Sequence, residues 1–584
     1  MSERARAGVW PRRLANAYLL AVALFAAAVA WHAAHEHLTD LFVDDWRILD
    51  HYQSLPLAAY LTTPENGHHI PLTLALFALD HELFGGRMHL LVALAVVCLG
   101  LAFALVARGL FAHDRLASPT TRLVLGFTAF ALAWAASCHD LLWGLNQDSP
   151  QAVALVVLAL LALGRVAPGP VRAQWRPLAL AGAAAIGATL SQAVGVASWA
   201  ALVGVAVVRR LGPRVVAGLA VCGALVVGLF AASIPPHPKI SFADSLAFAT
   251  REPLALAELG IAFVGGAPAR VASALGVGAA MPGQPSRAAW SAHTKDLYRL
   301  ALGFGGVGLV LFALIAFRRW RRPLARSQVD ALAVGLMAFG LGGAALVGFA
   351  RASLFGPAAV VQTRFVTWSA LFWIGAVVAL LPRDPARAAS RPARCAALLL
   401  PLLSLAMLPA LREAHAFHAT RVVQARKLAL SLQLGLRDAG LARRESIHEA
   451  ELVFRVADRL REQGRPPFDG PRRDLRGAPL SERFADAGVC AGALERARRI
   501  SGTGAIEVWG WIPAEAPTPA FVVLADAAGA IRGLAEVAAA PASKHAGRVA
   551  WSGFVAEYDA GERYTAWAIS ADQRDACRLT AGAP

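Results

Sequence analysis

The chain has 584 residues, of which 57% are hydrophobic and only 16% are charged, and its mean hydropathy is +0.51. Soluble globular proteins average about 45–50% apolar and about 25% charged residues, so this composition indicates a membrane protein and excludes a mostly disordered chain. The formal net charge of +17 raises the question of nucleic-acid binding, and the six cysteines are too few for a disulfide scaffold.

Apolar segments suited to crossing a bilayer recur along the first two thirds of the chain, and each span needs about 20 mostly apolar residues. The stretch Leu178–Val208 is too long for one span and is interrupted near Ser191-Gln192, so we predict two short helices that meet in a hairpin. With these two, the total is about eleven membrane helices. The other predicted spans are Leu14–Ala34, Met88–Leu110, Leu123–Cys138, Ala152–Leu163, Val215–Ile234, Leu300–Phe317, Ala331–Gly348, Phe365–Leu381 and Cys395–Leu411.

Arginines fill the short loops on one side of the membrane when the predicted helices are threaded alternately. That side is cytoplasmic by the positive-inside rule, so these arginines read as topology signals rather than as a nucleic-acid-binding stripe. The first apolar run lacks a small-residue cleavage site and is expected to remain as an uncleaved span. The N-terminus is therefore expected in the cytoplasm and the C-terminal tail outside it. The densest cluster is Arg318, Arg319, Arg321, Arg322 and Arg326, and Arg209, Arg210 and Arg214 form another.

The tail after the last span changes from helical to strand periodicity. Ser446–Glu449 has capping-box spacing and precedes an apolar stripe of Val453, Val456, Ala457 and Leu460, which predicts a helix. From about residue 502 the period becomes two, which predicts a small β-sandwich or barrel of about five strands. The predicted strands are Ile506–Ile512, Phe521–Leu524, Ile531–Val537, Val549–Tyr558 and Tyr564–Ile569.

Cys490 and Cys577 bracket this β-module. A disulfide between them is expected if the tail lies in an oxidising compartment, although sequence does not supply the geometry that the bond needs. The module's tryptophans either stack on sugar rings or fill a small core, and core filling is favoured. These tryptophans are Trp509, Trp511, Trp551 and Trp567.

Acidic and imidazole side chains cluster in the first outer loop, which follows the first span. Like charges on the adjacent carboxylates Asp44 and Asp45 raise the pKa of one of them, which suits a general base. A bound divalent cation would instead keep both ionised, with His68 or His69 as a further ligand. The competing interpretation is a solvated loop beside the membrane. The candidates in this loop are Asp44, Asp45, Trp46, Glu65, His68 and His69.

The second outer loop, Ser137–Ser149, is short, so its polar groups are expected at the membrane face. Asp148 is the better candidate for a second acid, with Asp140 beside it. The competing interpretation is that Asp148 or Ser149 caps the helix that starts near Pro150. The candidates in this loop are Asp140, Trp143, Gln147 and Asp148.

Two arginines, Arg351 and Arg364, flank a short outer loop on the side where positive charge is disfavoured. Arginine at headgroup level can hold a phosphate with two hydrogen bonds, or its side chain can simply extend to lipid headgroups. The sequence contains no G-x-x-x-x-G-K-[ST] motif, no H-E-x-x-H motif and no dinucleotide fingerprint.

Four elements in this order resemble the C-type (GT-C) polytopic membrane glycosyltransferase superfamily, in particular its uncharacterised bacterial members. They are the acidic-aromatic Asp44-Asp45-Trp46, the run Glu65–Pro71, the Trp-Gly-x-x-Gln element Trp143–Gln147, and Arg364–Thr367 ahead of an apolar helix. The likeness covers roughly residues 1–412, and the tail is also similar.

The resemblance implies an enzyme that takes a sugar from a polyprenyl-phosphate donor on the extracytoplasmic face of a bacterial inner membrane. Asp44 or Asp45 would be the catalytic base, and Asp148 or Asp140 would assist or bind a metal. The sequence Asn146-Gln147-Asp148 departs from the family's aromatic-Gln pattern, which puts this second role in doubt.

The implied reaction is direct displacement with inversion, to a glycan, lipid or protein acceptor. Arg351 and Arg364 would offset the charge on the departing lipid phosphate, with or without a divalent metal at Asp44, Asp45 and His68. The substrate-binding candidates are Trp46, His68, His69, Trp143 and Gln147.

The predicted architecture is an α-helical polytopic membrane domain at 1–412, a helical connector at 413–475 and an extracytoplasmic β-domain at 476–584. Two other functions stay open. A transporter or flippase of lipid-linked saccharide would show broken helices and charges at the membrane midplane. A non-catalytic assembly protein would present the β-domain to a polysaccharide machine.

Overall fold

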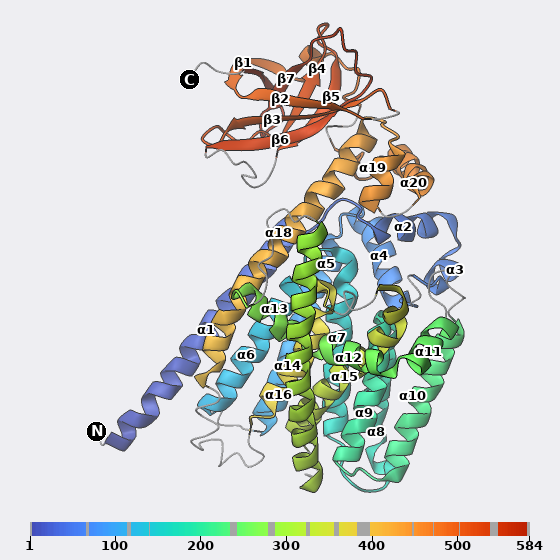
Figure 1. Ribbon diagram of the computed structural model, residues 1–584, viewed down its shortest axis with the longest axis vertical. Coiled ribbons are helices and arrows are strands. Elements are labelled where there is room, and N and C mark those ends of the chain that lie inside the picture. Colours follow the sequence, from blue (N-terminus) through green and yellow to red (C-terminus); the bar gives the residue numbers. More distant parts are fainter. Residues whose placement is uncertain are drawn as a thin grey trace. The chain divides into compact units, whose positions relative to one another are not determined.

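The computed structural model forms two compact units (Figure 1). The first comprises Met1–His37, Ala58–Leu79 and Met88–Phe417; the second comprises Leu38–Leu57, Asp80–Arg87 and His418–Pro584. The structure describes residues 3–65, 69–113, 118–138, 140–233, 242–277, 287–322, 327–355, 361–381, 398–446, 449–470, 472, 474–500, 503–537 and 547–580.

The first unit, here the helical unit, consists of helices along its described length. Its larger helices are α1 (Glu3–Glu36), α4 (Pro71–Phe84), α5 (His89–His113), α6 (Pro119–Ser137), α7 (Asp148–Gly164), α8 (Trp175–Ser191), α9 (Ala197–Val208), α10 (Pro213–Ser233), α11 (Phe242–Arg251), α12 (Pro253–Val264), α13 (Gly266–Ala274), α14 (Arg287–Arg321), α15 (Gln328–Phe355), α16 (Val366–Val378) and α18 (Leu400–Gln433), which continues into the second unit. Short helices are α3 (Leu57–Thr62), η1 (Gly144–Gln147), η2 (Val171–Gln174), η3 (Ala193–Val196) and η5 (Thr363–Phe365).

Six described helices are long and apolar enough to cross a membrane, or seven if the bent pair α12–α13 counts as one span, so this is a multi-pass membrane protein. The six are the spans in α1, α5, α7, α10, α14 and α15. The predicted total of about eleven also counts α6, α8, α9, α16 and α18, whose described parts are shorter or less apolar. The span in α7 is 78% buried, whereas those in α1, α10 and α14 are 17% buried, as expected of central and lipid-facing helices respectively.

Interhelical hydrogen bonds from polar side chains tie α18 to its neighbours. The Trp134 indole of α6 donates to the Met407 carbonyl at 2.9 Å, and the Tyr18 and Ser404 hydroxyls share a hydrogen bond of 2.6 Å. Since lipid offers no water to such groups, each of them needs a partner inside the protein. These contacts fix α18 against α1 and α6.

The bent pair α12–α13 turns by 60° at Gly265. The spans predicted from the sequence do not include this segment, so the broken helix was not expected. Ser369 of α16 accepts the Ala267 N–H at 2.9 Å and donates to the Val264 carbonyl at 2.7 Å, so it pairs the backbone groups that the bend releases. A β-carbon added at Gly265 would lie 1.9 Å from the Ala301 carbonyl, so only glycine permits this approach to α14.

The predicted break in the apolar stretch 178–208 is confirmed. Helix α8 ends at Ser191, Gln192 is extended with φ −155° and ψ 144°, and η3 and α9 follow. A β-carbon on Gly195 would lie 2.0 Å from the Ala188 carbonyl, so the chain turns back tightly against the end of α8. The Thr73 hydroxyl donates to the Ser191 carbonyl at 3.1 Å and thereby pairs one exposed backbone group of this break.

Two of the arginines predicted as topology signals are in fact buried. Arg209 donates to the carbonyls of Leu163 and Val166, at 2.7 and 3.0 Å, and so joins the ends of α7 and α9. Arg319 of α14 forms an ion pair of 2.5 Å with Asp330 of α15, and both side chains are buried. These guanidinium groups hold helix ends together, which charge patterning in the sequence does not reveal.

Replacement of Asp330 by alanine is expected to destabilise the helical unit by about 3–5 kcal/mol, because it leaves the Arg319 charge buried without this carboxylate. Thermal unfolding of the detergent-solubilised protein measures the effect. Arg318→Ala, which removes an exposed neighbouring charge, is the matched control. Equal unfolding temperatures for the two variants would contradict a structural role for the pair.

The helical part of the second unit, here the tail unit, contains a segment from the first outer loop. Helix α2 (Asp44–Ser54) packs on α20 (Ala450–Gln463), and Asp50 accepts from Arg455 at 2.8 and 3.0 Å. The predicted apolar stripe of α20 is confirmed, since all four of its residues are buried. The predicted capping box is wrong: Ser446 ends the preceding helix, α19 (Ala439–Ser446), and donates to the Ala442 carbonyl within it.

The β-module of the tail unit is one curled sheet of eight strands in the order β1-β8-β7-β4-β5-β6-β3-β2. The five predicted strands correspond to β3–β7. The prediction missed β1, β2 and β8, because β1 and β2 are largely exposed and lack an apolar alternation. A four-residue helix, α21 (Leu480–Arg483), precedes the sheet. The strands are β1 (Ala485–Ala491), β2 (Ala493–Arg499), β3 (Ile506–Pro513), β4 (Phe521–Ala525), β5 (Ile531–Val537), β6 (Arg548–Val555), β7 (Thr565–Ile569) and β8 (Asp575–Thr580).

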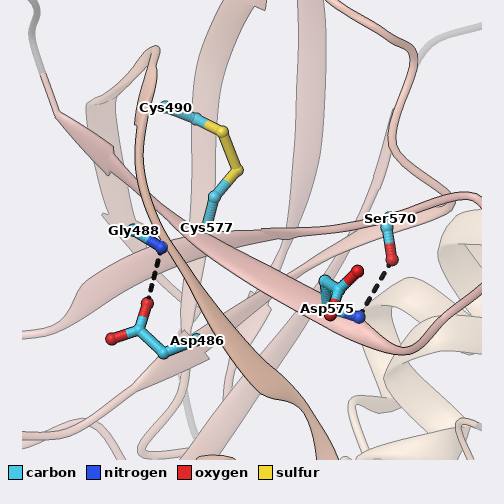
Figure 2. Close-up of a disulfide and its surroundings, with 6 residues drawn as sticks. All are labelled: Asp486, Gly488, Cys490, Ser570, Asp575 and Cys577. Carbon is cyan, nitrogen blue, oxygen red and sulfur yellow. Dashed lines mark hydrogen bonds between the residues drawn. A yellow bond between two sulfur atoms is a disulfide. The ribbon is translucent and has the colours of Figure 1, made fainter.

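The disulfide between Cys490 and Cys577 is confirmed, and it joins the paired strands β1 and β8 (Figure 2). The bond fits an extracytoplasmic location for this module, because disulfides persist in oxidising compartments. The expectation that tryptophans fill the core holds for Trp551, which is buried, whereas Trp509, Trp511 and Trp567 are half-buried.

Reduction of the denatured protein is expected to expose two additional thiols to maleimide, counted by mass spectrometry against unreduced protein. The Cys577→Ser variant should lose about 4 kcal/mol of β-module stability, because the disulfide closes a loop across a sequence separation of 87. Limited proteolysis of the module measures this loss. Cys222→Ser, an exposed free cysteine, is the control. No gain of label on reduction would contradict the bond.

Candidate functional site

The second outer loop places a buried acid in the helical unit. Asp140 lies between α6 and η1 and is 1% exposed. Thr367, in the first turn of α16, donates its hydroxyl to Asp140 Oδ2 at 2.6 Å. Burial raises the pKa of Asp140 well above its usual range, the Thr367 hydrogen bond opposes this effect, and the charge of Asp148 raises the pKa further. The environment therefore favours the protonated form of Asp140 beside a second carboxyl group.

That second carboxyl group belongs to Asp148, at the start of α7. The Ser149 hydroxyl donates to Asp148 Oδ1 at 3.3 Å, and the Gln192 amide donates to the Ser149 hydroxyl at 3.3 Å. The predicted capping role is not seen, because Asp148 is a residue of α7 itself and the N-cap is Gln147, which makes no side-chain capping bond. Asp140 and Asp148 thus form an interacting acid pair.

A cation lies near the end of α6, from which the second outer loop starts. Arg270 of α13 donates to the Val361 carbonyl at 2.5 Å. The Cys138 thiol, at the end of α6, is within electrostatic range of Arg270, Asp140 and Glu413. The bend at Gly265 therefore precedes a guanidinium that interacts with Glu413 and with Cys138 at the end of α6.

Four side-chain amides near the acid pair have buried polar atoms with no hydrogen-bond partner among the described residues. Such an atom costs about 1–3 kcal/mol unless something binds it. Gln147, which is fully buried, also makes a long contact of 3.5 Å from Nε2 to the Thr73 hydroxyl. The four atoms are Asn146 Nδ2, Gln147 Oε1, Gln151 Oε1 and Gln192 Oε1.

Close packing in this site requires the glycine of the Trp-Gly-x-x-Gln element. A β-carbon on Gly144 would lie 2.5 Å from the Met88 side chain, so glycine allows η1 to lie against the start of α5. Trp143 is buried beside it. The element thereby fixes the position of Gln147 and of the acid that follows.

The remaining predicted residues of the helical unit are more dispersed. Arg364 lies on η5, three residues before Thr367, with its guanidinium 5.0 Å from the Phe365 ring centroid. Glu65 is buried, and His69 shares a hydrogen bond of 2.7 Å with the Ser233 carbonyl at the end of α10. Arg351 belongs to α15, but its side chain lies outside the described residues, and so does the whole of His68.

Asp44, Asp45 and Trp46 belong to the tail unit, where they start α2. Asp45 is fully buried and accepts the Phe42 N–H at 2.9 Å, so its carboxylate holds the start of the helix. Asp44 is partly exposed and pairs with Arg47 at 3.3 Å. Because Asp45 is buried, Asp44 is the more accessible carboxylate of the two, and Trp46 is buried as well.

The residue preceding this pair, Val43, has a φ of 46°, which is strained for a β-branched side chain. Strain of this kind concentrates at functional sites. Within the described parts of the chain, no group of three or more His, Cys, Asp or Glu side chains is placed to hold a metal ion. The predicted metal site at Asp44, Asp45 and His68 remains a prediction.

Sequence reasoning missed Arg270, Thr73 and Gln192 as members of the site. The signal for Arg270 is the pair Gly265-Gly266 followed by Pro268 inside an apolar stretch, which breaks a helix just before a charge.

No protein-family model, no curated protein and no solved structure matches the chain.

Asp140→Asn is expected to raise the unfolding temperature of the detergent-solubilised protein. The folded chain with a raised Asp140 pKa retains a proton that the unfolded chain releases above about pH 4, so the wild type loses stability as pH rises toward the folded pKa. Asparagine has no titrating proton and so avoids this pH-dependent loss of stability, while its amide oxygen can still accept the hydrogen bond from the Thr367 hydroxyl. The gain in unfolding temperature over wild type should therefore grow as the pH rises from about 5 to about 8. A loss of stability, or a gain independent of pH, would contradict the buried acid.

Proposed function

We propose that this protein is a membrane glycosyltransferase that moves a sugar from a polyprenyl-phosphate donor to an extracytoplasmic glycan, lipid or protein acceptor. The observation that carries the proposal is the interacting pair of Asp140 and Asp148 at the ends of helices in a polytopic domain, with Arg270 within electrostatic range of the neighbouring Cys138. Transfer from a lipid phosphate needs a carboxylate to accept a proton and a cation to balance the leaving phosphate. The resemblance of the sequence motifs supports the same class.

In the proposed reaction, the acceptor hydroxyl oxygen attacks the anomeric carbon from the face opposite the lipid phosphate. The carbon–oxygen bond to the phosphate breaks, its electron pair leaves with the phosphate, and the hydroxyl proton passes to a carboxylate. Asp148 is the proposed carboxylate, since it begins α7 and the Ser149 hydroxyl, itself bonded by the Gln192 amide, donates to its Oδ1. Arg270, with Arg364 and Arg351, offsets the charge on the departing phosphate.

The unpartnered amides suit the sugar in this proposal. A sugar hydroxyl both donates and accepts hydrogen bonds, so it would satisfy the carbonyl oxygens of Gln147 and Gln192 and the Asn146 amide. A site that hydrogen-bonds hydroxyls rejects analogues that lack them, which gives selectivity between sugars.

The resemblance places the base at Asp44 or Asp45 instead. Of these two, Asp44 is favoured, because the Asp45 carboxylate is already bonded to the backbone of Phe42. The other parts of the proposed architecture are eleven membrane helices, a cytoplasmic N-terminus and a bacterial inner-membrane location.

The test is incubation of purified protein with a panel of polyprenyl-phosphate sugars, followed by measurement of free polyprenyl phosphate. Asp148→Asn should lower the rate of release by about 100-fold or more, the usual contribution of a general base. Asp244→Asn, at an exposed position of α11, is the matched control.

Two results would count against the proposal. Loss of activity in Asp44→Asn with a normal rate in Asp148→Asn would move the base to the first outer loop. Absence of release from every donor, with and without acceptors, would contradict the transferase itself.

A second candidate, a transporter of lipid-linked saccharide, is supported by the two interrupted helices at Gln192 and Gly265, since transporters bind substrate at such breaks. Proteoliposomes containing a fluorescent lipid-linked sugar distinguish the two functions. Transbilayer movement above that of empty liposomes, without release of lipid phosphate, would favour the transporter.

A further inference from the structure

The last turns of α14 combine aromatic and basic side chains on a surface that faces lipid. The span within this helix, His293–Arg321, is only 17% buried, and Phe317 and Trp320 near its end are both exposed. Tryptophan is enriched where a membrane span meets the headgroups, because its ring is apolar and its indole N–H is polar. The end of α14, which Figure 1 shows at the lower edge of the helical unit, therefore has the composition of a segment at headgroup level.

Three arginines at this end of α14 point outward. Arg318, Arg321 and Arg322 are exposed, and spacings of three and four residues make the other two neighbours of Arg318 on the helix surface. Like charges at these spacings repel one another. Arg319, the buried arginine of the same turn, has the carboxylate of Asp330 as its partner. Among the described residues, none of the three exposed arginines has a carboxylate within ion-pairing distance.

A fourth arginine reaches this surface from the loop after α9. Arg210 has a φ of 53°, in the left-handed region. Its N–H donates to the Val207 carbonyl at 3.0 Å, and the Leu211 N–H donates to the Ala206 carbonyl at 3.0 Å. These two bonds form a Schellman motif, in which the left-handed position is usually glycine. An arginine held there despite the backbone strain indicates that its side chain has a use.

The Arg210 side chain is directed to α14. Its Cζ lies 4.7 Å from the Trp320 ring centroid, and the Cζ of Arg321 lies 4.5 Å from the Phe317 ring centroid. An aromatic ring attracts a cation but offers no oxygen, so neither contact supplies the acceptors that guanidinium N–H groups bind most strongly. The structure describes no carboxylate paired with Arg210 either. The two rings therefore hold two guanidinium groups against the exposed side of α14 without neutralising them.

We propose that this surface, formed by Arg210, Phe317, Arg318, Trp320 and Arg321, binds the headgroup of an anionic phospholipid. A phosphate accepts two hydrogen bonds from one guanidinium, and basic surfaces between membrane helices recognise anionic headgroups. A zwitterionic lipid would bring an ammonium group that the arginines repel. The acyl chains would lie along exposed apolar side chains earlier in α14. These are Val307, Val310 and Leu314.

This lipid site does not depend on the proposed transfer reaction, because none of its residues belongs to the site around Asp140 and Asp148. Failure of the transfer assay leaves the lipid proposal untouched, and the reverse also holds.

The test is native mass spectrometry of the purified full-length protein in detergent, titrated with phosphatidylglycerol, with phosphatidylcholine of the same acyl chains, or with glycerophosphate. We expect phosphatidylglycerol to bind more tightly than the other two. The double variant Arg210→Gln and Arg321→Gln should weaken binding of phosphatidylglycerol roughly tenfold or more, through loss of two basic groups at the headgroup. Arg210→Lys with Arg321→Lys keeps both charges and should retain most of the preference.

The matched control is Arg12→Gln with Arg13→Gln, which removes two exposed arginines from the end of α1, a helix that packs on α6. It should bind phosphatidylglycerol like the wild type. An unfolding temperature equal to that of the wild type, measured in detergent without added lipid, shows that each variant is folded.

Four results would overturn the proposal. Two concern the variants: unchanged binding of phosphatidylglycerol by Arg210→Gln with Arg321→Gln, or equal weakening by the control. Equal affinity for phosphatidylcholine would show that the arginines do not select the headgroup. Equal affinity for glycerophosphate would show a site for free phosphate instead of a lipid.

Discussion

The structure of the helical unit depends on one constraint, which is that polar groups among apolar helices must find partners inside the protein. The unit meets this constraint at its helix breaks and ends: Ser369 pairs the backbone released at Gly265, and Thr73 pairs the carbonyl of Ser191. Arg319 and Asp330 pair with each other in the same way. Against this background, a group that remains unpartnered is informative.

Some of these groups lie around Asp140 and Asp148, and others in the unit include Ser198, Trp199 and Gln328. Asp140 has a single described side-chain donor, Thr367, and four amide atoms nearby have none among the described residues. These unpartnered atoms contribute nothing favourable to stability. Retention of costly polar atoms is typical of a binding or catalytic site, where stability is exchanged for function. The account of a sugar-transfer site rests on this acid pair and the unpartnered amides beside it.

Much of the fold could be predicted from the sequence, because apolar length and period are local properties. The break at Gln192 followed from a polar pair inside an overlong apolar stretch, and strands β3–β7 followed from alternation. Strands β1 and β2 could not be found in this way, since their partners rather than their own residues define them. The α12–α13 bend was missed because its glycines and Arg270 resemble loop composition, and Ser369, which stabilises it, is distant in sequence.

The candidate site was predicted in part for the same reason. Asp140, Asp148, Trp143 and Gln147 are neighbours in sequence, so one loop revealed them. Arg270 and Thr367 come near this loop only through helix packing, which cannot be predicted from a single sequence. The adjacent acids Asp44 and Asp45 looked equivalent, but the fold gives them different tasks, because the Asp45 carboxylate holds the backbone of Phe42.

The most direct test of the central claim is photo-crosslinking with a polyprenyl-phosphate sugar that carries a diazirine on the sugar, followed by peptide mapping. The account predicts labelled peptides from the loop between α6 and α7 and from the segments of α13 and α16 that contain Arg270 and Thr367, with labelling suppressed by unlabelled lipid-linked sugar. Labelling confined to other helices, or labelling that excess unlabelled donor does not reduce, would contradict it.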